Sequence, residues 1–193
     1  MWLIAGLGNP GEEYEWTRHN IGFIIVDELS RRFNIPLRYK TKAYIYGKGD
    51  IDGIPVILLK PLTFMNRSGS AIMAVLDRFR EIDDILIIHD DLDLNLGVMR
   101  IKRGGSSGGH RGVESIIQSI GNADFVRLRI GIGRSRRLSP ERYVLTPFSK
   151  RERTMVELVV DDAITAVSTI MSKGISYAQN VFHKKKDLLI HST

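Results

Sequence analysis

Apolar residues recur along the chain with two spacings, one typical of helices and one typical of strands. From Ile21 to Phe33 they lie three and four residues apart, which predicts an amphipathic helix. Trp2 to Leu7 and Ile85 to Ile88 are nearly continuous apolar runs of strand length, which predicts buried strands. Further strands are predicted at 43–46, 55–59, 98–102 and 126–132, and further helices at 68–79, 113–120 and 155–170, with a short one after Gly174.

The alternation of strands and helices predicts an α/β fold, a single domain in which a mixed, twisted sheet lies between helices. Only the turn-like pairs Gly49-Asp50 and Asp52-Gly53 separate the strands at 43–46 and 55–59, so no crossover helix fits there and part of the sheet must be antiparallel. Ser68 is expected to cap the helix that follows it. Met155 and Leu158 are expected to face inward.

No internal repeat, low-complexity tract or linker divides the 193 residues. Residues 1–185 are expected to form one domain, and 186–193, which overlap the basic run Lys184–Lys186, a frayed polar tail. The apolar stretch Met1 to Ala5 is too short for a signal peptide, and no run approaches the roughly 18 residues that a membrane span needs. A cytoplasmic location without membrane contact is expected.

The composition excludes cysteine chemistry and favours an anionic partner. The chain contains no cysteine, which excludes disulfides, thiolate catalysis and cysteine-ligated zinc. Lysine and arginine number 28 against 22 aspartate and glutamate, a net charge of +6. Six arginines fall between Arg127 and Arg142, with Lys102, Arg103 and Arg111 upstream. This charge favours an anionic partner, with nucleic acid as the leading candidate.

Polar residues follow four of the predicted strands. In chain order, these strands lead into Asn9, Phe64-Met65-Asn66, His89-Asp90-Asp91 and the glycine-rich run Gly104–Arg111. Ligands of α/β sheets bind beyond the carboxyl ends of the strands, so the four segments predict a single site.

Three patterns suggest other ligands, and each departs from its motif. Gly6–Gly11 has the glycine spacing of a dinucleotide-binding loop, but no helix pattern begins at Gly11. Gly104–Arg111 lacks the Lys-Ser/Thr pair of a phosphate loop, and Asp91–Lys102 ends in lysine where a calcium loop has glutamate. His89, Asp90 and Asp93 have no metal-ligand spacing, so no metal site is expected.

His19 is the strongest candidate for acid–base chemistry. It lies just before a predicted helix, and an imidazole can take a proton from water when a carboxylate fixes its tautomer. Asp90, at the end of a buried strand, is suited to be that carboxylate. With no thiol and no G-x-S-x-G motif, an activated water is the favoured nucleophile, and Asn9 and Asn66 could donate to a developing oxyanion.

Several segments together resemble the signature of bacterial-type peptidyl-tRNA hydrolases. They are Asn9–Gly11, Tyr14–Gly22, Lys60–Gly69, His89–Asp93 and Phe125–Gly133, and they keep the family's order and spacing to about residue 185. The resemblance implies an enzyme with no cofactor, usually monomeric, that cleaves the ester between a peptide and the 3′ ribose of tRNA. Such an enzyme recycles tRNA from aborted translation.

The resemblance also implies roles for individual residues. His19 is similar to the base that activates water, Asp90 to the group that orients it, and Asn9 to the residue that recognises the peptide. The remaining substrate-site residues implied are Tyr14, Phe64, Met65 and Asn66, and the tRNA-phosphate contacts are expected from Lys102, Arg103, Arg129, Arg136 and Arg137.

One position departs from the family. The chain has His110-Arg111-Gly112 where the family usually has His-Asn-Gly. Arg111 is expected to bind the anionic substrate through its hydrogen-bond donors and its positive charge. Two alternatives stay open. A non-catalytic RNA-binding homologue of the same fold has no need of both His19 and Asp90, and a nicotinamide enzyme would retain its cofactor on purification.

Overall fold

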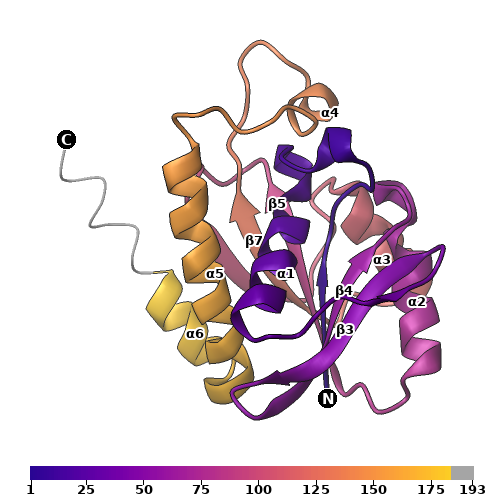
Figure 1. Ribbon diagram of the computed structural model, residues 1–193. Coiled ribbons are helices and arrows are strands. Elements are labelled where there is room, and N and C mark those ends of the chain that lie inside the picture. Colours follow the sequence, from indigo (N-terminus) through magenta and orange to yellow (C-terminus); the bar gives the residue numbers. More distant parts are fainter. Residues whose placement is uncertain (184–193) are drawn as a thin grey trace.

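The structure is a computed structural model that describes residues 1–183, arranged as a seven-stranded sheet with helices on both faces (Figure 1). The predicted tail 186–193 and the basic run Lys184–Lys186 lie outside the described residues. The strands are β1 (Trp2–Gly6), β2 (Tyr39–Lys40), β3 (Tyr44–Ile51), β4 (Ile54–Pro61), β5 (Asp84–Asp91), β6 (Met99–Arg103) and β7 (Val126–Gly131). The helices are α1 (Ile21–Arg32), α2 (Ser68–Arg78), α3 (Arg111–Ile120), α4 (Pro140–Tyr143), α5 (Arg153–Lys173) and α6 (Ile175–Phe182), with 3₁₀ turns η1 (Glu12–Tyr14), η2 (Arg18–Asn20) and η3 (Met65–Arg67).

The sheet is mixed, which confirms the predicted fold class. Its order is β2-β3-β4-β1-β5-β7-β6. The central strand β1 is parallel to β4 and β5, and β7 is parallel to β5, whereas the other three pairs are antiparallel. Gly49-Asp50 continues β3 and is not a turn, so this prediction is wrong. The hairpin turns at Asp52-Gly53, where φ is +53° and +79°.

Each face of the sheet has its own hydrophobic core. Helices α1, α5 and α6 cover one face, and α2 and α3 cover the other (Figure 1). Strand β1 contributes to both, because Ile4 lies in the first core and Leu3 and Ala5 lie in the second. Among residues 1–183, no helix is long and apolar enough to cross a membrane.

Helix α1 lies close to β1 because two glycines face each other. A Cβ on Gly22 would lie 2.4 Å from the backbone nitrogen of Leu7, and a Cβ on Gly6 would lie 2.1 Å from the backbone oxygen of Gly22. The first glycine of the Gly6–Gly11 pattern is therefore needed for helix–strand packing. The turn η1 follows that pattern in place of a long helix.

Two helix predictions are wrong in detail. Ser68 is the first residue of α2 and does not cap it, because its hydroxyl donates to the backbone oxygen of Met65 at 2.8 Å. Met155 and Leu158 are 40% and 57% exposed, and the buried stripe of α5 begins instead at Val156. A stripe displaced by one residue has the same period, so the spacing alone does not choose between the two faces.

Strand β6 is at the edge of the sheet, and side chains from the carboxyl-terminal end of the described chain occupy its free backbone groups. His183 Nε2 accepts from the Ile101 nitrogen at 2.9 Å, and Gln179 donates to the Ile101 oxygen at 3.0 Å. Burial and the neighbouring Arg100 lower the pKa of His183, which favours the neutral ring that can accept. Covering an edge in this way removes a template for pairing with other chains.

Candidate active site

The carboxyl ends of β1, β4 and β5 meet at one end of the sheet, because these strands are parallel. A cavity of about 700 Å³ lies there. It brings together most of the predicted catalytic and substrate-binding residues, namely Asn9, His19, Phe64, Met65, Asn66, Asp90 and Arg111.

The fourth predicted segment reaches this cavity by a route that the sequence did not indicate. Strand β6 is antiparallel to β7, so it ends at Arg103 beside Asp84, at the opposite end of the sheet. Residues 104–110 then return to the cavity, where buried Arg127 donates to the backbone oxygens of Ser106, at 2.7 Å, and Gly104. Gly104, Gly105, Gly108 and Gly109 all have positive φ, which explains why this return loop is rich in glycine.

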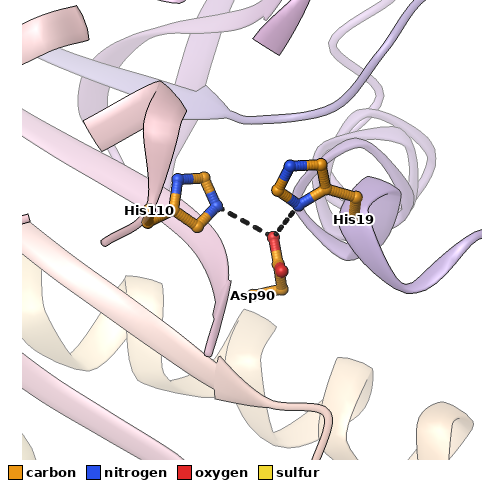
Figure 2. A group of neighbouring side chains, drawn as sticks. All are labelled: His19, Asp90 and His110. Carbon is orange, nitrogen blue, oxygen red and sulfur yellow. Dashed lines mark hydrogen bonds and ion pairs between the residues drawn. The ribbon is translucent and has the colours of Figure 1, made fainter. Parts of the chain in front are cut away.

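One carboxylate oxygen holds two histidines in the cavity (Figure 2). Asp90 Oδ1 lies 2.8 Å from His19 Nδ1 and 2.9 Å from His110 Nε2. Asp90 is the last residue but one of strand β5 and is 2% exposed, while His19 comes from η2 and His110 precedes α3. The two rings lie 5.0 Å apart.

The hydrogen-bond partners show which ring nitrogen of each histidine carries the proton. His110 Nδ1 accepts from the backbone N–H groups of Gly112 and Val113 at 3.2 and 3.3 Å, so its proton is on Nε2 and is donated to Asp90. Burial raises the pKa of Asp90, but His19 and His110 outweigh burial and hold this pKa well below its ordinary value. Because an ionised carboxylate only accepts, neutral His19 donates from Nδ1 and keeps a lone pair on Nε2, the nitrogen turned away from Asp90 (Figure 2).

Among residues 1–183, the same three residues form a group that could hold a metal ion, since their ligand atoms all lie within 4.8 Å of one another. A metal would need the lone pair of His110 Nε2. The amide N–H groups at His110 Nδ1 keep the ring proton on Nε2, however, so the group fits a hydrogen-bonded triad better than a metal site.

His89 lines the cavity next to this triad. Its Nδ1 donates to the backbone oxygen of Asp90 at 2.8 Å, and its Nε2 has no hydrogen-bond partner in residues 1–183. Burial and the neighbouring His110 lower the pKa of His89 well below its ordinary value, so this ring is neutral.

Asn9 is held from three sides, which leaves one group free. Asn20 accepts from its backbone nitrogen at 2.8 Å and donates to its backbone oxygen at 2.9 Å. Its Oδ1 accepts from the Met65 nitrogen at 2.9 Å. The Nδ2 amide group of Asn9 has no partner among the described residues and is available as a donor at the cavity.

Cations also line the cavity. Arg129 donates to Asp91 at 2.6 Å and Arg134 donates to Asp93 at 2.7 Å, which engages both carboxylates of the calcium-like pattern. Burial and nearby Arg129 lower the pKa of Arg127. The other two lining cations are Lys102 and Arg111, and within residues 1–183 Lys102 has no acidic partner. This surplus of positive charge favours an anionic ligand.

Four predicted site residues are not among those that line the cavity. Tyr14 is in η1, and Arg103 is paired with Asp84 and Asp124 away from the site, at 3.0 and 2.6 Å. Arg136 and Arg137 are exposed on the connection between β7 and α4, close in sequence to Arg134.

His110 is the functional residue that the sequence analysis did not assign. Its position was visible as the last residue of a glycine-rich run before a helix, which is where a side chain that accepts from helix N–H groups belongs. Its contact with Asp90 depends on the path of the return loop, which no local pattern reveals.

Comparisons with known proteins agree with one another. A family model described as peptidyl-tRNA hydrolase matches residues 3–188. A peptidyl-tRNA hydrolase of Thermodesulfovibrio yellowstonii is 38% identical, over 95% of this chain and 100% of that protein, and one of Bacillus subtilis is 42% identical, over 96% and 100%. The crystal structure of a peptidyl-tRNA hydrolase from Acinetobacter baumannii is similar with a TM-score of 0.85 and 41% identity, over 93% of each chain.

Proposed function

The chain belongs to the peptidyl-tRNA hydrolase family, whose members hydrolyse the ester bond of peptidyl-tRNA, and from this premise we propose that His19 activates the attacking water. The observation that carries the proposal is the 2.8 Å contact between His19 Nδ1 and Asp90 Oδ1. It leaves the His19 Nε2 lone pair to take a proton from water as that water attacks the ester carbonyl.

The charge that develops in this step is matched by the residues nearby. Proton transfer makes His19 an imidazolium, which the buried Asp90 carboxylate stabilises. The free Nδ2 of Asn9, together with Asn66, donates to the developing oxyanion or to the peptide backbone. His19 then returns its proton to the 3′ oxygen as the ester bond breaks.

The rest of the cavity binds the two ends of the substrate. Asn9 recognises the peptide, with Phe64, Met65 and Asn66 as further substrate contacts in the cavity and Tyr14, on η1, as a contact outside it. Cations contact the tRNA phosphates, and the exposed arginines near residue 136 extend that surface. The phosphate contacts proposed are Lys102, Arg111, Arg129, Arg136 and Arg137; Arg103 is left out, because it pairs with Asp84 and Asp124 at the opposite end of the sheet.

The proposal includes the setting in which the enzyme works. One domain over residues 1–185, acting as a monomer in the cytoplasm without a cofactor, carries out the reaction. The surplus of positive charge, +6 for the whole chain, supports binding to a free polyanion such as tRNA.

The test is the release of tRNA from N-acetyl-aminoacyl-tRNA, with unblocked aminoacyl-tRNA as the control substrate. General-base catalysis contributes about 10² to 10⁴ in rate, so His19→Ala is expected to lose that much turnover and still bind tRNA. Near-normal turnover of His19→Ala would refute the assignment of the base. Binding of tRNA without release by the wild type would instead support the non-catalytic homologue.

A further inference from the structure

Arg18, the residue before His19, is not among the residues that line the cavity, and its side chain is only 8% exposed. Its guanidinium donates to the two carboxylate oxygens of Glu152 at 3.0 and 2.9 Å, and its Nε donates to Thr146 Oγ1 at 3.1 Å. The rings of Tyr143 and Phe148 lie 4.5 and 5.0 Å from its Cζ. The proposed chemistry uses none of these contacts.

All of these partners belong to residues 132–152, the connection from β7 to α5, which we call the strap. The strap also pairs with the backbone of the His19 turn. The Arg18 nitrogen donates to the Thr146 oxygen at 3.1 Å, and the His19 nitrogen donates to the Val144 oxygen at 2.8 Å. The backbone of the proposed base is therefore held by the strap.

The strap contributes to the site as well. Arg134, Arg136 and Arg137 lie near its start, and Glu141 and Val144 line the cavity. Its beginning is fixed to the sheet, because the Tyr143 hydroxyl donates to the Ile132 oxygen at 2.8 Å. One segment thus connects the proposed tRNA contacts to the turn that carries His19.

Stability alone gives little reason to bury Arg18 with Glu152. The desolvation of such a pair offsets most of its attraction, and apolar replacement of both residues is often neutral or stabilising. Burial raises the pKa of Glu152, but Arg18 and Ser149 outweigh burial and lower it, so the carboxylate stays charged. A bidentate guanidinium–carboxylate pair does, however, fix the orientation of the two side chains relative to each other.

We propose that Arg18 is a positioning residue for ester cleavage, which holds the strap against the His19 turn and so fixes the direction of His19 Nε2. This inference rests on the proposed role of His19. Arg18 touches neither substrate nor reacting atoms, so it is expected to set kcat and to leave KM nearly unchanged. A displacement of about 1 Å in a reacting group can cost about 100-fold in rate.

The experiment compares Arg18→Met, Arg18→Lys and the double variant Arg18→Met/Glu152→Leu in the full chain. The control is Arg32→Met, which removes a guanidinium that pairs with Glu28 and Asp161 away from the cavity. The measurements are kcat and KM for N-acetyl-aminoacyl-tRNA, the urea midpoint, and the nitrogen-15 signals of the His19 ring. These signals report the Nδ1–H donated to Asp90 without any turnover.

We expect kcat to fall about 100-fold in Arg18→Met. In Arg18→Lys, which keeps the charge but cannot form the bidentate hydrogen bonds, kcat should fall about 10-fold. KM should change less than about 2-fold in both variants. The double variant should regain the urea midpoint and keep the low kcat, with altered His19 signals. The control should match the wild type in all three measurements.

Recovery of kcat together with the urea midpoint in the double variant would overturn the inference, since Arg18 would then only stabilise the fold. Unaltered His19 ring signals in Arg18→Lys would overturn it as well, and this variant decides if Arg18→Met does not fold. A normal kcat in Arg18→Met would refute the role of Arg18 while His19→Ala still shows the loss that the proposed function requires.

Discussion

Replacing Asp90 by asparagine removes the charge of the carboxylate and nearly preserves its shape. The asparagine oxygen can still accept from the two rings, which lie 2.8 and 2.9 Å from Oδ1 in the wild type, but the imidazolium formed during catalysis loses its counter-charge. Two unit charges about 4 Å apart at an effective dielectric constant of about 20 attract each other by about 4 kcal/mol. Loss of that attraction corresponds to a fall of about 10³ in kcat.

The assay measures kcat and KM for N-acetyl-aminoacyl-tRNA across pH. The control is Asp77→Asn, because Asp77 is on α2 and pairs with Arg80 at the surface. The pKa of Asp90 lies well below its ordinary value, so Asp90 stays charged over the assay range and acid does not imitate the substitution. The acidic limb of the pH profile of kcat should shift in Asp90→Asn, because the carboxylate that faces the proposed base has lost its charge. A loss of less than about 10-fold, or an unmoved limb, would contradict this electrostatic role.

Two further predictions concern binding and two concern stability, each through one local contact. Arg111→Asn should raise KM modestly and weaken its salt dependence, and Arg111→Glu should be far worse than Arg111→Ala; equal effects of Ala and Glu would mean that Arg111 points to solvent. The double change Arg136→Ala/Arg137→Ala should lower the log–log salt slope of substrate affinity by about two with kcat unchanged, and an equal slope would place the tRNA elsewhere. The pKa of His183 is lower in the folded than in the unfolded chain, so the contribution of His183 to stability is present above about pH 6.5 and is lost as pH falls. His183→Gln should therefore weaken the dependence of the urea midpoint on pH between pH 7.5 and 5.5, and an unchanged dependence would refute this. Gly22→Ala should cost roughly 1–3 kcal/mol of unfolding free energy, since the clash with backbone outweighs a helix gain of about 1 kcal/mol; an unchanged urea midpoint would show that α1 can shift.

Much of the fold could be predicted because its strands and main helices are long enough to show a period. The helix at Ile21–Arg32 and the strand at Trp2–Gly6 were found with nearly correct bounds. Strand β2 and helix α4 were missed, because two and four residues show no period. The direction of β6 could not be predicted from local sequence either. The strand is antiparallel to β7, and the loop at 104–110 brings the chain back to the end of the sheet at which a parallel strand would have ended.

The residues of the candidate site also fall into those that could be predicted from the sequence and those that could not. Asn9, Phe64–Asn66 and Asp90 lie at or just beyond the carboxyl ends of parallel strands, so topology alone brings them together. His110 comes after an antiparallel strand, and its place beside Asp90 depends on tertiary structure. The Arg18–Glu152 pair joins residues more than 130 positions apart, which no spacing in a single sequence shows.

The central position of β1 has a consequence for how the chain is made. Trp2 pairs with Val56 on one side and with Asp84 on the other, so β1 leaves the ribosome well before either of its partners is synthesised. Until β5 emerges, one hydrogen-bonding edge of β1 has no native partner, and pairing over such long separations is slow. Strand β5 also carries Asp90, so the pairing that completes the middle of the sheet also brings this carboxylate to the end of β1 where the candidate active site lies.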